Sequence, residues 1–304
     1  MTWTNLARAA EDSVKYLGSE QAKASLARDP YWPKWDSPWW HMALLSELGE
    51  SKLIPLDTAK ALAASIRATW KPFFPKTKAE VPPGEDAYRV IGCHCALGTA
   101  LQLLSSCGLD PDAEIPFARR FLLDSQLPDG GLNCETAAYE TSRKSSLVST
   151  LPALEAMLYC TKRPFTPEEE AFLDRGAQYL LAHKLFRSTK GGMIKSEWTE
   201  PCFPRFYDYD VLRGLSFLSH LGAQRPLPWR EHCGEALEIV SRWAEREFKV
   251  SRPLPTVNSL VREGDVWKQG RAAEFPLLKF ARGGDGAREA LSREWRQVTC
   301  AGRC

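Results

Sequence analysis

The chain alternates between two kinds of helical pattern. Four stretches place apolar residues at spacings of three and four and keep a polar opposite face: 57–71, 114–126, 166–186 and 230–248. Four others are apolar almost all round: 38–49, 86–106, 145–160 and 206–221. The first pattern is typical of helices with one face in water, and the second of helices buried on several sides. The buried stretches begin about 50 to 60 residues apart, the period expected of stacked helical hairpins.

Other parts of the chain add helices and loops to this alternation. Residues 3–26 predict one helix, and Arg288 begins a last one, whereas the pattern fades from about Lys249. No segment shows sustained strand alternation. The sequence therefore predicts a single all-α domain over 1–304. We expect an inner ring of buried helices inside an outer ring of amphipathic ones, an (α/α) toroid of about five to six helical hairpins around a central cavity. The portion after about 249 is poorly defined.

Charge and hydropathy exclude several classes of protein. The net charge of +2 gives no basic surface for a nucleic acid, so we expect no nucleic-acid partner. No stretch approaches about 18 apolar residues, so no transmembrane segment is predicted. The first residues lack the apolar run of a signal peptide. The nine cysteines are odd in number and irregularly spaced, which favours reduced thiols and a cytoplasmic location. The oligomeric state is left open.

The stretch Arg119–Glu135, RRFLLDSQLPDGGLNCE, combines a helix end with a tight turn. Its run LLDSQLPDGGLNC resembles the glutamine-to-tryptophan repeat of squalene and oxidosqualene cyclases and of protein prenyltransferase β subunits. Gln126, Asp129, Gly130 and Gly131 match that repeat, and Leu132 stands where tryptophan would be. A weaker echo has Gln178 and Gly191-Gly192. The resemblance implies an (α/α) toroid of the terpenoid cyclase and prenyltransferase-like superfamily, with a central cavity.

The acid and metal motifs of those enzymes are incomplete here. Class II triterpene cyclases carry Asp-x-Asp-Asp, and this chain has Asp208-Tyr209-Asp210 without a third aspartate. The Asp-x-Cys motif that binds zinc in prenyltransferase β subunits is absent from the sequence. The resemblance therefore carries the fold rather than the chemistry.

A metal site is predicted from the rim at which the inner helices begin. The helix N-termini meet there and add positive potential. The candidate ligands are Cys93 or Cys95, His94, Cys134 and Cys202. Sulfur with imidazole is a ligand set typical of zinc, and three protein ligands leave one position open for substrate. Two cysteines in Cys-x-Cys lie about 200° apart on a helix, so both face one metal only if the helix is distorted. The alternative is a set of buried thiols and a hydrogen-bonded histidine.

A second hypothesis assigns catalysis to carboxylates. Asp208 and Asp210 lie on opposite faces near a predicted helix start, so only one can point inward. Asp208 and Glu135 are the predicted acid–base pair, with Asp36 as another partner. Alternatively, Asp208 or Asp210 interacts with the helix dipole and Asp36 caps a helix. The remaining histidines are predicted at the surface: His183, His220 and His232.

Four residues are predicted to contact substrate: His41, Arg205, Tyr207 and Trp39. Arg205 suits a phosphate or carboxylate, and its alternative is a structural ion pair with Glu135, Asp208 or Asp210. Trp39 belongs to an aromatic group that either accepts an isoprenoid or cation, or plugs the ring: Tyr31, Trp32, Trp35, Trp39 and Trp40.

These features lead to an expected enzyme of the terpenoid cyclase or prenyltransferase-like class. It would act on a small or isoprenoid-like molecule in the central cavity, with help from a Cys/His metal site. The alternative is a non-catalytic binding or scaffold module that grips a lipid, peptide or partner helix. A polar cluster with perturbed protonation would favour the enzyme, and a continuous apolar groove the binder. A third hypothesis, a carbohydrate-active barrel, requires two carboxylates facing each other across the cavity.

Overall fold

The structure is a computed structural model that describes residues 3–31, 37–69, 93–135, 138–206, 208–250, 259–263, 266–270, 274–282 and 284–300. The longer helices in chain order are α1 (Trp3–Leu17), α2 (Glu20–Arg28), α3 (Pro38–Glu47), α4 (Leu56–Thr69), α6 (His94–Ser106), α8 (Ala118–Asp124), α9 (Leu147–Cys160), α10 (Pro167–Ala182), α11 (Val211–Gly222), α13 (Gly234–Glu245), α14 (Pro276–Arg282) and α15 (Asp285–Cys300). Short helical turns are α7 (Pro111–Glu114), α12 (Trp229–His232), η1 (Ser51–Leu53), η3 (Ala138–Ser142) and η4 (Ser196–Thr199).

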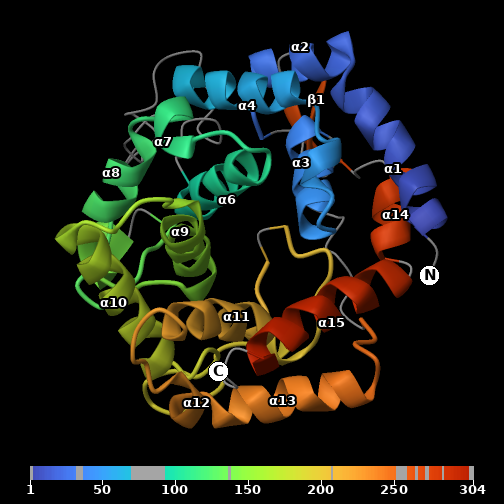
Figure 1. Ribbon diagram of the computed structural model, residues 1–304. Coiled ribbons are helices and arrows are strands. Elements are labelled where there is room, and N and C mark those ends of the chain that lie inside the picture. Colours follow the sequence, from blue (N-terminus) through green and yellow to red (C-terminus); the bar gives the residue numbers. More distant parts are fainter. Residues whose placement is uncertain are drawn as a thin grey trace.

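Helices α3, α6, α9 and α11 lie toward the middle of the molecule, while α4, α7, α8, α10, α12 and α13 lie around them (Figure 1). Burial follows this arrangement: 12 of the 14 residues of α9 are buried, against four of the 12 in α13. The all-α class is thus confirmed for the bulk of the chain, and the two kinds of helical pattern correspond to the two positions. The C-terminal helix α15 packs beside α11, and α14 packs beside α1.

The turn between α8 and α9 shows why its residues are required. The Gln126 side chain donates to the carbonyl oxygens of Gly130 (2.7 Å) and Phe172 (2.9 Å), which joins the turn to α10. Gly130 has φ +94°, and a Cβ there would lie 2.3 Å from the Arg175 carbonyl oxygen. Asp129 accepts a hydrogen bond from the backbone amide of Ser145 at 2.9 Å, at the approach to α9. The motif therefore locks a central helix to two peripheral ones.

Several helix boundaries differ from the prediction. The helix expected over 3–26 is broken at Gly18, and Ser19 caps α2 by accepting from the Ala22 amide. The helix expected over 114–126 is interrupted because Pro116 restricts Ile115 to a non-helical conformation. Within the predicted helix over 86–106, the structure describes α6 from His94 onward, with Cys93 as its N-cap. Of its earlier residues, 86–92 lie outside the described ranges.

The region after 249 contains an element that the sequence did not predict. Strands β1 (Ser259–Glu263) and β2 (Val266–Gly270) pair antiparallel, with Ser259 opposite Gly270 and Glu263 opposite Val266. The expectation of helices and loops alone was therefore wrong for this short hairpin. Among the described residues, none of the helices combines the length and apolar character needed to cross a bilayer.

Candidate functional site

A cavity of about 410 Å³ lies among the central helices, within the size range of small-molecule sites. Helices α3, α6, α9, α11 and α15 line it together with the segment 203–206. Its charged lining residues are Glu47, Glu155, Arg205, Arg213, Arg293 and Glu294. Its apolar lining residues are Ala43, Leu103, Phe203, Phe206, Ala290 and Leu291. The cavity is thus a mixed polar and apolar site rather than a continuous apolar groove.

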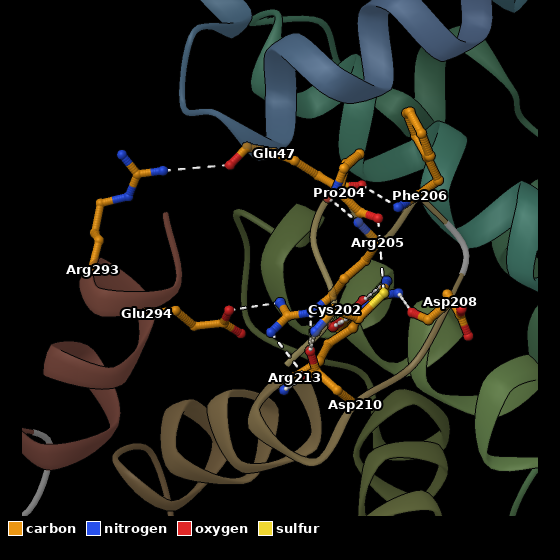
Figure 2. A network of polar contacts seen from close by, with 11 residues as sticks. Glu47, Cys202, Pro204, Arg205, Phe206, Asp208, Asp210, Arg213, Arg293 and Glu294 are labelled. Carbon is orange, nitrogen blue, oxygen red and sulfur yellow. Dashed lines mark hydrogen bonds and ion pairs between the residues drawn. The ribbon is translucent and has the colours of Figure 1, made fainter. Parts of the chain in front are cut away.

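Glu47 ends α3 and holds the segment that leads to α11. Its carboxylate accepts hydrogen bonds from the backbone amides of Arg205 (2.7 Å) and Phe206 (Figure 2). Burial raises the pKa of the Glu47 carboxyl, although the two amide donors and the nearby arginines oppose that shift. Glu47 is therefore a carboxyl group of altered acidity on the cavity wall.

Arg205 is shared between two carboxylates. Its guanidinium donates to both oxygens of Asp210, at 3.0 and 2.9 Å, and to Glu294 at 2.6 Å (Figure 2). Asp210 is fully buried and caps α11 by accepting from the Arg213 amide; it also accepts from the Cys202 amide. Glu294 has fewer donors, and burial raises its pKa, with the Asp210 charge adding to the shift. Burial therefore favours the protonated form of Glu294.

A second buried ion pair crosses between α9 and α11. Arg213 donates to the two oxygens of Glu155 at 2.9 and 2.6 Å, and Gln102 of α6 donates to the same carboxylate at 3.3 Å. These contacts join three central helices at the cavity floor. Both side chains of the pair are almost inaccessible, so each charge depends on its partner.

Three cysteine sulfurs meet where α6 begins. Cys93 Sγ lies 2.7 Å from Cys95 Sγ and 3.1 Å from Cys134 Sγ, and the Cys95 and Cys134 sulfurs are 3.7 Å apart. Cys93 is the N-cap of α6 with extended backbone angles, φ −95° and ψ 118°. It therefore escapes the helical spacing that would separate the two sulfurs of Cys-x-Cys. Hydrogen bonds with Cys93 and Cys95 hold the pKa of the Cys134 thiol well below its usual range, which favours the thiolate form that binds a metal.

The cysteine cluster (Cys93, Cys95 and Cys134) could hold a metal ion. Three sulfurs bound to one tetrahedral zinc at about 2.3 Å are separated by about 3.8 Å. The Cys95–Cys134 separation already matches that value, and the other two pairs need to open by about 1 Å or less. The donor set fits a thiophilic ion.

The structure brings together only part of the predicted ligand set. Cys93 and Cys134 meet as expected, and Cys95 joins them. His94 is fully buried; its ring stacks on Phe121, with centroids 5.0 Å apart. It interacts with the Cys134 thiol, but its ring nitrogens fall outside the group of converging ligand atoms found among the described residues. Cys202 also falls outside that group.

Cys202 is buried beside Asp210, to which its backbone amide donates, and its sulfur lies 3.9 Å from the Pro204 carbonyl oxygen (Figure 2). It was placed at the rim because it precedes a central helix. Eight residues separate Cys202 from Val211, where α11 begins, so Cys202 does not belong to the first turn of that helix.

The predicted catalytic carboxylates are not brought together among the described contacts. Glu135 is exposed, and its backbone amide donates to the Asn133 side chain. The Asp208 side chain accepts a hydrogen bond from the Tyr209 amide at 2.8 Å. Neither Glu135 nor Asp208 lines the cavity. Asp210 lies at the N-terminus of α11, where the alternative of a helix-dipole partner places it, and its side chain caps that helix. Asp36, the other partner considered, lies outside the described residues.

The predicted substrate contacts divide into three cases. Arg205 lines the cavity, but its guanidinium is occupied by carboxylates. His41 and Trp39 are buried in the core, away from the cavity lining. The His41 ring stacks on Phe275 at 3.9 Å, and desolvation lowers its pKa to about 3. Tyr207 lies outside the described residues.

The three histidines predicted at the surface also differ. His232 is exposed, as expected, whereas His183 is half-buried. His220 is half-buried and lines the cavity, with its ring against Tyr159 at 5.4 Å.

The cavity residues that sequence reasoning missed carry a visible signal. Glu155 and Arg213 are the single charged residues of two otherwise apolar helices, α9 and α11. A lone charge on a fully buried helix needs a partner, and here the two are partners of each other. Glu47 ends α3, and Glu294 lies in a helix with an ordinary amphipathic pattern. Neither position is distinctive in the sequence.

The cavity also faces a different part of the central helices than predicted. Glu47, Gln102 and Glu155 come from the C-terminal halves of α3, α6 and α9, whereas the prediction used the N-terminal ends. Comparison with known proteins adds no assignment: no family model, no curated protein and no solved structure matches this chain.

Proposed function

We propose that the protein is an enzyme that performs acid–base chemistry on a small polar molecule in the central cavity. The observation that carries this proposal is the convergence of carboxyl groups from three helices, Glu47, Glu155 and Glu294, on one cavity. Arg213 holds both oxygens of Glu155, whereas Arg205 contacts one oxygen of Glu294, and Glu47 accepts from two backbone amides. Glu47 and Glu294 are therefore the residues assigned to proton exchange with a ligand. Their raised pKa values support the assignment, because acid–base groups work best near the ambient pH.

The two carboxyl groups have different surroundings and therefore different roles. Glu294 shares Arg205 with the fully buried Asp210, and burial together with the Asp210 charge raises its pKa, so it retains a proton and acts as the acid. Glu47 accepts two backbone amides, which stabilise its ionised form, so it acts as the base. Phe203, Phe206 and Leu291 supply an apolar wall for the rest of the substrate.

The proposed scaffold is the (α/α) toroid of the terpenoid cyclase and prenyltransferase-like superfamily. Support comes from the Gln126–Gly131 turn and from the central and peripheral placement of the two helix types (Figure 1). The polar lining favours a polar substrate over an isoprenoid hydrocarbon. It also favours an enzyme over the alternative lipid-gripping or scaffold module, which would need an apolar groove.

The test combines a proton titration with a turnover screen. Carboxyl ¹³C NMR of glutamate-labelled protein should show two groups titrating above the ordinary glutamate value of about 4.3, one lost in Glu47→Gln and the other in Glu294→Gln. A library of polar metabolites incubated with wild-type protein should lose at least one component, and both variants should slow that loss by at least about 100-fold.

The control variant is Glu238→Gln, which changes an exposed glutamate outside the cavity. It should behave as wild type in both measurements. Ordinary titration of both cavity glutamates, a library left intact by the wild-type protein, or full turnover in both variants would each refute the proposal.

A second candidate role rests on the cysteine cluster. We propose that Cys93, Cys95 and Cys134 bind one zinc ion. The ion would cross-link α6 to the loop before α9 and would leave its fourth ligand position open. Metal analysis after mild purification should give about one zinc per chain, lost in Cys134→Ser but kept in Cys300→Ser, a change at an exposed cysteine. Less than about 0.3 zinc per wild-type chain would discard it, and another metal at full occupancy would keep the site but exclude zinc.

A further inference from the structure

The three arginines of the cavity differ in how their charges are balanced. Arg205 contacts Asp210 and Glu294, and Arg213 contacts Glu155. Arg293 of α15 makes one hydrogen bond within the described part of the chain, a donation from Nη2 to the backbone carbonyl of Glu47 at 3.4 Å (Figure 2). No carboxylate of the described residues pairs with it. A guanidinium has five N–H donors, so most of those of Arg293 remain available.

A glycine leaves room for this guanidinium. Gly49 follows α3 with φ +82°, and a Cβ there would lie 3.1 Å from both Nη1 and Nη2 of Arg293. The absence of a side chain at Gly49 lets the planar group pack against the backbone at the cavity edge. Arg293 is therefore positioned before any ligand arrives, which lowers the entropy cost of binding.

We propose that Arg293 anchors a carboxylate of the substrate in the central cavity. The inference rests on the proposed function, because it assigns the ligand class of the same site. A carboxylate matches the fork of a guanidinium and forms two parallel hydrogen bonds with it. Gln297 lies one turn further along α15, also lines the cavity and offers an amide donor to the same group.

The charge balance favours a monoanion over a phosphate dianion. Three guanidinium groups share the region with four carboxyl groups: Glu47, Glu155, Asp210 and Glu294. One negative charge on the ligand matches the unpaired charge of Arg293. Arg205 and Arg213 already pair with carboxylates, so a second negative charge would have no further guanidinium to balance it in a partly desolvated site. The apolar wall of Phe203, Phe206 and Leu291 suits a carboxylic acid with an apolar or mixed body.

The experiment uses benzoate as the monoanionic probe, benzamide as its uncharged isostere and inorganic phosphate as the dianion. Isothermal titration calorimetry with wild-type protein should detect benzoate binding, at least 10-fold weaker binding of phosphate, and no binding of benzamide. Arg293→Met should weaken benzoate binding at least 10-fold, and Arg293→Lys should weaken it less. The matched control, Arg296→Met, changes an exposed arginine of the same helix and should leave binding unchanged.

Equal benzoate affinity in wild type and Arg293→Met would overturn the assignment, as would absence of benzoate binding or tighter binding of phosphate. If Arg293→Met fails to fold, NMR of the arginine side-chain ¹⁵N resonances in wild-type protein takes its place. Benzoate should shift the resonances of one guanidinium, and a spectrum without any shift would refute the assignment of Arg293 as the carboxylate anchor. These binding measurements do not depend on turnover. Failure of the anchor is therefore distinguished from failure of acid–base catalysis, which is read from the Glu47 and Glu294 variants.

Discussion

The turn that resembles the cyclase repeat provides a controlled test of the packing between α9 and α10. Gly130 and Gly108 both adopt left-handed backbone angles, with φ +94° and +81°. They differ in their surroundings, because a Cβ at Gly130 would lie 2.3 Å from the Arg175 carbonyl oxygen, whereas one at Gly108 meets nothing within 4 Å. Alanine substitution at the two positions therefore separates the conformational cost from the steric cost.

The magnitudes follow from these two terms. Gly108→Ala should lower the free energy of unfolding by about 1 kcal/mol, the cost of a left-handed alanine. Gly130→Ala adds the displacement of a helix backbone, which overpacking data place at about 1–3 kcal/mol, for a total of roughly 2–4 kcal/mol. For a chain of this size, the melting temperature should fall by about 2 °C and about 4–8 °C, respectively.

Urea unfolding followed by circular dichroism gives both free energies, and calorimetry gives both melting temperatures. The m-value should stay constant, since neither change alters the surface exposed on unfolding. Equal losses in the two variants would show that α10 does not approach Gly130 as described. A gain in stability for Gly130→Ala would refute the left-handed turn as well.

Three further predictions concern other parts of the core. Gly98→Ala should lower the free energy of unfolding by at least about 1 kcal/mol, because its Cβ would lie 2.4 Å from the Pro152 carbonyl oxygen. The control Gly234→Ala, whose Cβ meets open space, should not destabilise the protein. Equal urea midpoints for the two variants would contradict this prediction. Burial lowers the pKa of His41 to about 3, so the unfolded state alone binds its proton below pH 6.5, and stability should fall by up to about 1.4 kcal/mol per pH unit as the pH drops from 6.5 toward 3. His41→Asn should remove this contribution to the pH dependence of stability. Superimposable stability–pH profiles of wild type and variant would refute the prediction. The hydrogen bond from Arg163 holds the pKa of Glu169 at about 2, so the contribution of Glu169 to folding stability is present above pH 4.5 and is lost as the pH falls toward 2. Glu169→Gln should therefore lower the free energy of unfolding at pH 7 by about 2 kcal/mol and weaken its decrease below pH 4.5, as measured by urea midpoints.

The helical class was predictable because burial leaves a direct trace in the sequence. Helix α9 is apolar almost all round in the sequence, and 12 of its 14 residues are buried. Helix α10 begins with a capping box between Thr166 and Glu169, a pattern that is visible in the sequence. Breaks inside the predicted helices were missed where one residue decides the outcome. Pro116 acts on Ile115, and Ser19 caps a helix directly after Gly18.

The candidate site was less predictable because its residues meet only through tertiary packing. Periodicity places Glu47 and Glu294 on helices but does not reveal which end of each helix faces the cavity. The cysteine cluster was partly predictable, since the sequence places Cys93 and Cys134 among the candidate metal ligands. The extended backbone of Cys93, which admits Cys95 as well, depends on the capping geometry of α6 rather than on spacing. Buried His41 and Trp39 show that reactive or aromatic residues at early helix turns also serve as core.

The contacts that build the cavity join segments very far apart along the chain. The hydrogen bond from the Arg205 amide to Glu47 spans 158 residues, the Arg205–Glu294 ion pair spans 89, and the Arg293–Glu47 contact spans 246. Such pairings form only after large loops have closed, so they arise late in folding, after the local helical hairpins. Detachment of α15 alone would remove Arg293 and Glu294 together while the other helices stay folded. Ligand occupancy and the docking of that helix are therefore thermodynamically linked, and a bound molecule should slow amide exchange in α15 more than in α6 or α9.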